Sequence, residues 1–303
     1  MTAASNRRAR KLAAPGAPPI GQPVGIVGLG LLGGSLAQAI RDRWPATPIL
    51  AVETDRATRA RALARGFVDD VTATPQPGFG VVRVVLLCVP YGRVESTSRA
   101  LGKHLRPGTL VCDVVGVKAP VAAIVRRNLA RARYIGTHPM AGGERRGLEN
   151  SRRELFAGRP VALCPGPTVS PATLLAVKRF WAALGALPVV VSPGQHDRIV
   201  ARTSHLPYLL GLCLLRIAAE LPGSRRLLGG AFLDATRRVG FSPEVMAAAV
   251  AVNGFVPASL SRFADECRRL AALIRESPAR LTEEAEEGRR LLAQIAGQPG
   301  TFA

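Results

Sequence analysis

The chain has 303 residues, 48% of them hydrophobic, which is enough to fill the core of one large or two ordinary globular domains. Lys and Arg outnumber Asp and Glu by 41 to 21, so the net charge is +20, but the basic residues are scattered and aromatic residues make up only 5% of the chain. This pattern is typical of solvated helix faces and argues against a protein that binds nucleic acid by base stacking.

Residues 1–22 are predicted to form a disordered leader, because four basic residues are followed by several prolines and there is no apolar stretch. A secretory signal is therefore not expected, and a transit peptide is the less favoured alternative. The longest nearly apolar run, 206–215, is too short to span a membrane. The five cysteines are odd in number and widely spaced, which predicts free thiols in a reducing cytoplasm, with no disulfides and no metal site.

A short apolar strand at 24–27 runs into a glycine-rich turn and then into a helix. Gly28 suits the tight turn, Gly30 leaves room for a pyrophosphate beside the backbone, and Gly33 lets the helix pack closely on the strand. Glu53 follows about 20 residues later, where an acid binds the 2′-hydroxyl of the ribose. The stretch therefore predicts an NAD site, and Arg56 keeps NADP as the alternative.

Short apolar runs alternate with helical patterns from residue 24 to about 191, which predicts a parallel sheet with helices on both faces. The strands are predicted at 24–27, 49–52, 81–89, 110–113, 133–137, 160–163 and 188–191, and the first two helices at 36–44 and 55–65. The fold class is therefore an α/β Rossmann-type doubly wound parallel sheet over residues 23–192.

Polar residues follow several of these strands, at the sheet edge where such folds bind ligands. Asp113 and Lys118 come after one strand and His138 ends another, so all three are expected around the nicotinamide. The predicted cofactor-binding residues are Gly28, Leu29, Gly30, Leu31, Leu32, Gly33, Glu53, Val89, Pro90, Asp113 and Lys118.

Beyond about residue 192 the pattern is helical throughout, which predicts an all-α C-terminal domain over 193–303 for substrate binding and dimerisation. One long helix is expected at 195–221, with a kink or break near Ser204 because Pro207 lies inside it. Further helices are expected at 227–238, 243–252, 257–274 and 282–296.

His138 is the candidate general base, because it follows a strand and sits in a glycine-rich segment that lets a ligand approach closely. The histidines have no metal-binding spacing and the chain has no G-x-S-x-G elbow, so neither a metal centre nor a serine hydrolase is predicted. What remains is hydride chemistry, in which a neutral imidazole takes a hydroxyl proton.

Several segments together resemble the prephenate/arogenate dehydrogenase family of tyrosine biosynthesis, over about residues 23–275. They are GLGLLGGSLA (28–37), DVVGVK (113–118), GTHPMAG (136–142), HD (196–197), SHLP (204–207) and DATR (234–237). The resemblance implies oxidative decarboxylation of prephenate or arogenate with NAD or NADP, in a homodimer. It implies that His138 takes the proton of the ring hydroxyl and that Arg237 binds the ring carboxylate.

The resemblance also places Ser204, His205, Tyr208 and Gly116 in the substrate cleft. From the residues alone, Arg237 is a solvated helix arginine. His196, like His138 and His205, falls where a cleft between the two domains is expected, and the alternative is that Asp197 with His196 only orients the first turn of its helix.

Three positions depart from the family pattern. Gly116 stands where the family usually has a serine, Tyr208 where it has a second histidine, and Met246 where a tryptophan is common. These departures leave open a relative that acts on a modified prephenate, such as a 4-amino analogue. A β-hydroxyacid or imine reductase of similar architecture is the other alternative, with a catalytic Lys or Asp in its helical domain.

Overall fold

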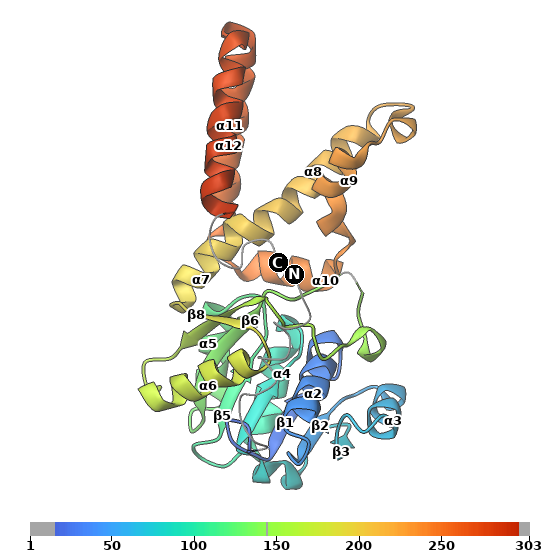
Figure 1. Ribbon diagram of the computed structural model, residues 1–303, viewed down its shortest axis with the longest axis vertical. Helices are drawn as coiled ribbons and strands as arrows, with labels where there is room; N and C mark the ends of the chain where they lie inside the picture. Colours follow the sequence, from blue (N-terminus) through green and yellow to red (C-terminus); the bar gives the residue numbers. More distant parts are fainter. Residues whose placement is uncertain (1–15, 144, 297–303) are drawn as a thin grey trace, which may run out of the picture.

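The computed structural model describes residues 16–143 and 145–296, which form a sheet domain with a group of helices standing on one of its edges (Figure 1). The sheet has eight strands in the order β3-β2-β1-β4-β5-β6-β7-β8. Their bounds are β1 Val24–Val27, β2 Ile49–Val52, β3 Asp70–Thr72, β4 Val84–Leu87, β5 Leu110–Asp113, β6 Arg133–Pro139, β7 Pro160–Pro165 and β8 Leu187–Val190.

Strands β1 to β6 are parallel, and the order reverses between β1 and β4, which is where such sheets bind nucleotides. The prediction that every strand is parallel is wrong for the last two strands, because β7 pairs with β6 in antiparallel fashion and β8 runs parallel to β7. The connection between these two strands contains only a short 3₁₀ turn, Leu148–Asn150, among its described residues, and no crossover helix carries the chain to the other end of the sheet.

Helices cover both faces of the sheet, as the apolar runs predict. Helices α2 (Leu31–Arg43), α3 (Arg56–Ala64) and α6 (Pro171–Ala183) pack on one face, and α4 (Tyr91–Gly102) and α5 (Ala119–Asn128) on the other. The packing of strand β4 explains why all four of its residues are apolar. Val84 and Leu86 belong to the first core cluster, Val85 and Leu87 to the second, so every side chain of the strand is buried.

The expected long helix is interrupted near Ser204, as Pro207 predicts. Helix α7 (Pro193–Val200) continues into a π-helical segment, Ala201–His205, and then into α8 (Leu206–Ala219). Proline has no N–H to donate to the preceding turn, and widening of the helix there removes the clash of its ring with the backbone. The segment places His205 in a buried position.

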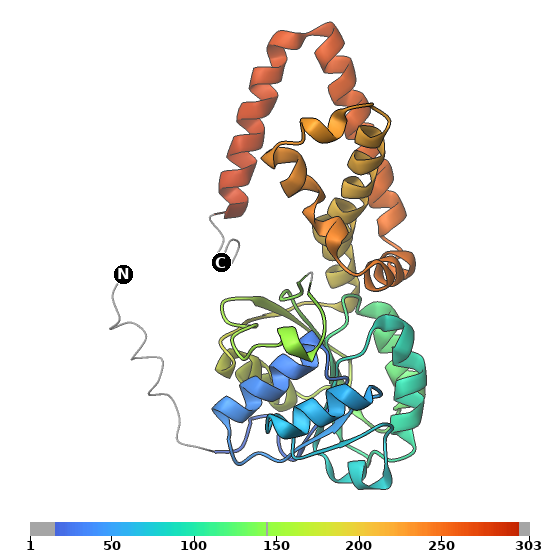
Figure 2. The same ribbon diagram turned by 90° about the vertical axis from the view of Figure 1, so that its right-hand side faces the viewer.

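The remaining helices are α9 (Gly230–Thr236), α10 (Pro243–Val252), α11 (Val256–Glu276) and α12 (Leu281–Ala296). In Figure 2, helices α11 and α12 are connected at the end of the molecule far from the sheet and diverge from there. Many large apolar side chains on this part of the chain are exposed, among them Ile217, Leu233, Ile274, Leu291 and Ile295. No single described helix is long and apolar enough to cross a membrane. The pair α10 and α11 passes such a test only when taken together, and the chain bends by 94° between them.

The differences from the predicted elements are local. The 81–89 run is shortened because 77–81 forms a 3₁₀ turn that buries Phe79. Strand β3 is not predicted because its three residues, one exposed and two half-buried, carry little apolar signal. Residues 1–15 of the expected leader lie outside the described part. Ile20, within the same expected leader, is buried in the core of the sheet domain.

Candidate active site

The glycine-rich turn after β1 leaves open space beside its backbone. Gly28 has φ +91°, and a side chain there would meet the carbonyl oxygen of Cys88 at 2.6 Å. A Cβ at Gly33 would lie 1.9 Å from the carbonyl oxygen of Gly28, whereas a Cβ at Gly30 would meet no atom within 4 Å. Two glycines are therefore required by packing, and the third borders an empty space of the kind a pyrophosphate needs.

Glu53 lies beside this turn, immediately after β2. Its carboxylate accepts the backbone N–H of Leu29 at 2.8 Å and that of Asp55 at 2.9 Å. Helix α2 starts at Leu31 without an acidic residue in its first turn, so no carboxylate of the helix itself repels a phosphate at its start. Val89, two residues beyond the end of β4, lies beside Gly28, where an added Cβ would meet its Cγ1 at 3.3 Å. These features fit an adenine dinucleotide whose ribose is held by Glu53.

His138 lies near the carboxyl end of β6, half-buried, and its ring takes part in a chain of hydrogen bonds. His138 Nδ1 lies 2.9 Å from His196 Nε2, and His196 Nδ1 lies 2.8 Å from Asp197 Oδ1. His196 and Asp197 are each only 2% exposed. His196 is therefore hydrogen-bonded to the candidate base, and Asp197 is connected to it through His196.

Asp197 is fixed at the start of helix α5, although it belongs to α7. Its carboxylate accepts the backbone N–H groups of Lys118 at 2.7 Å and Ala119 at 2.9 Å, where the helix dipole favours a negative charge. Burial acts to raise the pKa of Asp197, but the hydrogen bonds from His196, Ala119 and Lys118 outweigh it and hold that pKa below its ordinary value. Asp197 is therefore ionised at neutral pH.

The ionised carboxylate fixes the protons of both rings. Since Asp197 only accepts, His196 donates through Nδ1, and in the neutral form of that ring its Nε2 accepts. His138 must then donate through Nδ1, which leaves its Nε2 unprotonated. Burial, together with His196, Lys118 and His205, holds the pKa of His138 well below 6.5, so the ring is neutral at physiological pH. His138 thus carries a lone pair on Nε2, as a general base requires.

A Cβ on Gly116 would lie 3.7 Å from Nε2 of His138 and 3.8 Å from its Cε1. The loop after β5 therefore brings position 116 to the reactive side of the ring. A serine at this position would place its hydroxyl beside Nε2, and glycine leaves that space open.

Asn253, at the end of α10, holds the second cleft histidine and was not singled out by the sequence analysis. Its Nδ2 donates to the carbonyl oxygen of Asp197 at 2.8 Å and approaches Nδ1 of His205 at 3.2 Å. Burial lowers the pKa of His205, so that ring is neutral and carries its proton on Nε2. A lone asparagine at a helix end resembles an ordinary cap in the sequence.

The expectation that the side chains of Asp113 and Lys118 line the nicotinamide rim is wrong. Both are fully buried and form an ion pair with each other. Lys118 Nζ also donates to the carbonyl oxygen of Thr137 at 2.7 Å, and Asp113 accepts the hydroxyl of Tyr134 at 2.6 Å. The strand ends do meet at one edge, but these two charges neutralise each other beneath it and hold β5 to β6.

The other predicted substrate residues all come from the helical part. His205 and Tyr208 are buried and Ser204 is half-buried. Arg237 is exposed at the start of the 3₁₀ turn Arg237–Gly240, which packs on α8.

Two family models together match most of the chain. The model described as prephenate dehydrogenase, nucleotide-binding domain, matches residues 36–190, and that described as prephenate dehydrogenase, dimerization domain, matches residues 192–294. The cyclohexadienyl dehydrogenase of Zymomonas mobilis is 29% identical over 227 residues, which are 73% of this chain and 78% of that protein. Three further relatives are longer, and the chain spans only 58% to 60% of their lengths.

Two solved structures have the same architecture. The prephenate dehydrogenase of A. aeolicus, solved with hydroxyphenyl propionate and NAD+, has a TM-score of 0.84 and 27% identity, covering 91% of this chain and 98% of that one. The arogenate dehydrogenase of Synechocystis has a TM-score of 0.75 and 27% identity, covering 92% of this chain and 99% of that one.

Proposed function

The chain belongs to the prephenate dehydrogenase family, and from this premise we propose that it catalyses the NAD-dependent oxidative decarboxylation of prephenate or arogenate. The observation that carries the proposal is the hydrogen-bonded series from Asp197 through His196 to His138, which leaves a lone pair on Nε2 of His138. The substrate is a cyclohexadienol with a ring carboxylate, and its oxidation requires a base for the hydroxyl proton.

His138 takes that proton. As the ring hydroxyl loses its proton to Nε2, the positive charge on His138 is shared through Nδ1–H with His196 and stabilised by the carboxylate of Asp197. NAD, when bound, would supply the hydride acceptor for the hydroxyl-bearing carbon. Loss of CO₂ from the opposite ring position then makes the ring aromatic, and the carbonyl oxygen recovers a proton to give the phenol.

The glycine turn and Glu53 hold the cofactor. The open space at Gly30 would give the pyrophosphate access to the start of α2, and the carboxylate of Glu53 would accept from a ribose hydroxyl. Arg59 donates to the carbonyl oxygens of Glu53 and Thr54, at 2.8 and 2.7 Å, so its guanidinium stabilises the loop. An acid at this position disfavours a 2′-phosphate, which supports NAD over NADP.

The helical part holds the substrate. Arg237 binds the ring carboxylate through its planar fork, and His205, which can donate through Nε2, contacts the substrate together with Ser204 and Tyr208. The site thus combines a base from the sheet domain with a cation from the helices.

We further propose that the protein is a homodimer joined through its helical part. The match to a dimerization domain over residues 192–294 supports this, and so do the apolar side chains that α8, α9, α11 and α12 expose. The described cysteines are all free thiols, which supports a cytoplasmic location.

The test is turnover of the purified chain with NAD, followed by the absorbance of NADH. Prephenate, arogenate and the 4-amino analogue of prephenate are compared, because Gly116 and Tyr208 are the positions where selectivity for a modified ring would lie. His138→Asn is expected to lower kcat about 100-fold or more while the affinity for NAD stays unchanged. Turnover of none of the three substrates, or an unimpaired His138→Asn variant, contradicts the proposal.

A further inference from the structure

A cavity lies at the amino ends of the strands, the end of the sheet opposite to the candidate active site. It has a volume of about 410 Å³ and is lined by the residues that precede β1, β4 and β5, the first residue of β6 and the start of α6. The amino ends of parallel strands are not used by the dinucleotide, so the function proposed above does not account for this cavity.

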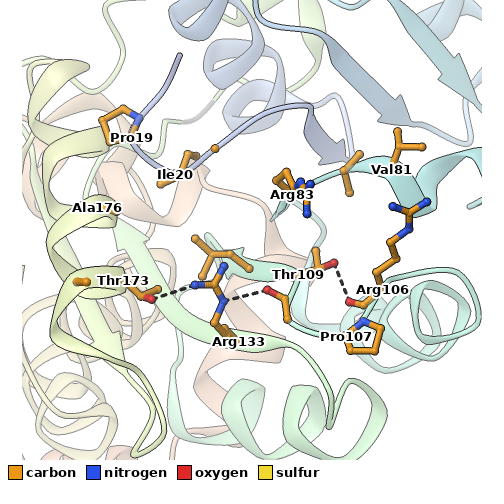
Figure 3. Close-up of a pocket in the computed structure, with 15 residues that line it drawn as sticks. Pro19, Ile20, Val81, Arg83, Arg106, Pro107, Thr109, Arg133, Thr173 and Ala176 are labelled. Carbon is orange, nitrogen blue, oxygen red and sulfur yellow. Dashed lines mark hydrogen bonds between the residues drawn. The ribbon is translucent and has the colours of Figure 1, made fainter. Parts of the chain in front are cut away.

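Three arginines surround the cavity (Figure 3). Arg83 immediately precedes β4, Arg106 lies in the turn before β5, and Arg133 is the first residue of β6. Arg133 is held in place, since its Nε donates to the carbonyl oxygen of Gly108 at 2.9 Å and its Nη1 to the hydroxyl of Thr173 at 3.1 Å. Its guanidinium is therefore oriented before any ligand arrives.

The positive charge here is not compensated within the described part of the chain. No aspartate or glutamate lines the cavity, and none of the three arginines forms an ion pair with a described carboxylate. Elsewhere on the surface, arginines such as Arg41, Arg127 and Arg153 do pair with acids. Guanidinium groups that surround one hollow repel each other unless an anion lies between them.

The walls between the arginines are apolar. Ile20 and Val82 are almost fully buried there, and Pro19, Pro107 and Ala176 complete this part of the lining. A cavity of this size, with a few cations on apolar walls, matches the usual composition of sites for small organic ligands. Inorganic ions alone would leave the apolar surface unused.

We propose that this cavity binds a small organic anion that carries two or more carboxylate or phosphate groups. Arg133 and Arg106 bind separate anionic groups, Arg83 adds the third positive charge, and the apolar walls contact the body of the molecule. The inference does not depend on the proposed dehydrogenase activity.

The experiment is isothermal titration calorimetry of the full chain saturated with NAD, so that the nucleotide site is filled. Citrate and fructose 1,6-bisphosphate are the probes, and they distinguish a carboxylate site from a phosphate site. The test variant is Arg83→Gln/Arg106→Gln. The matched control is Arg126→Gln/Arg275→Gln, which removes the same charge from two exposed arginines outside the cavity. Circular dichroism checks that each variant is folded.

At least one probe is expected to bind the unmodified chain with a stoichiometry of one per chain. The test variant should weaken that binding at least tenfold, and the control should change it less than twofold. Failure of both probes to bind overturns the proposal. So does an equal loss in the control variant, because that result indicates general attraction to a basic surface. Turnover is measured in parallel, so failure of the proposed dehydrogenase activity is recorded separately.

Discussion

Replacing Asp197 with asparagine tests whether the buried carboxylate sets the proton positions on His196 and His138. The carboxylate accepts three hydrogen bonds, from His196 at 2.8 Å, Lys118 at 2.7 Å and Ala119 at 2.9 Å. An asparagine of the same shape has one accepting oxygen and one donating NH₂ group. Whichever way the amide is turned, its NH₂ group faces a backbone N–H of α5.

The two orientations of the amide have different consequences for the base. With the oxygen toward His196, the wild-type proton positions persist. With the NH₂ toward His196, that ring accepts at Nδ1 and donates through Nε2, so His138 accepts at Nδ1 and carries its proton on Nε2, where it is no longer a base. Both orientations also lose the negative charge that stabilises His138 and His196 after His138 has taken the substrate proton.

We expect kcat to fall about 100-fold in Asp197→Asn, or about 2.7 kcal/mol at 1.36 kcal/mol per tenfold. This lies at the lower end of the contribution of a general base, because His138 itself is retained. The free energy of unfolding should fall by about 2 to 3 kcal/mol, for one lost charge-assisted hydrogen bond and one unsatisfied buried N–H.

The assay is steady-state turnover with saturating NAD and substrate, with urea unfolding in parallel. Asp69→Asn is the matched control, since Asp69 also accepts a backbone N–H, that of Ile49 at 2.7 Å, and it pairs with Arg41 on the other side of the sheet domain. The control should lose stability and keep kcat. A folded Asp197→Asn variant with unchanged kcat refutes the argument, as does an equal loss of kcat in the control.

Three further predictions concern pH and the substrate side of the site. Burial lowers the pKa of His138 below 6.5, so the ring stays unprotonated as the pH falls toward that value. We therefore expect kcat/KM to stay constant from about pH 8 to 6.5 and to fall only below pH 6.5. A decline of kcat/KM that begins above pH 7 contradicts this prediction. Arg237→Leu should raise KM about tenfold with little change in kcat, and an unchanged KM excludes Arg237 from carboxylate binding. In Gly116→Ser the added Cβ would lie 3.7 Å from Nε2 of His138. The new hydroxyl should raise kcat/KM about two- to tenfold through one new hydrogen bond. A decrease in kcat/KM indicates that the substrate fills that space.

Local patterns of the sequence were sufficient for most of the fold. The bounds of β1, β2, β5 and α10 agree with the structure, because buried parallel strands are continuous apolar runs and Ser242 with Pro243 starts the helix. The antiparallel direction of β7 is not evident from the sequence, because it depends on whether the connection after β6 crosses to the other end of the sheet before β7 begins. The short strand β3 was missed for lack of apolar signal.

The sequence by itself also determined the glycine turn, Glu53 and His138 as candidates, because each is defined by its position after a strand. Only the tertiary structure decided which charged groups reach the site and which neutralise each other. Asp113 and Lys118 pair beneath the sheet edge, whereas Asp197 crosses from α7 to the start of α5 and fixes the proton on His196. Lys118 and Asp197 are 79 positions apart in the sequence. Contacts of this kind depend on where two helices meet, and hydrophobic periodicity records only which face of each helix is buried.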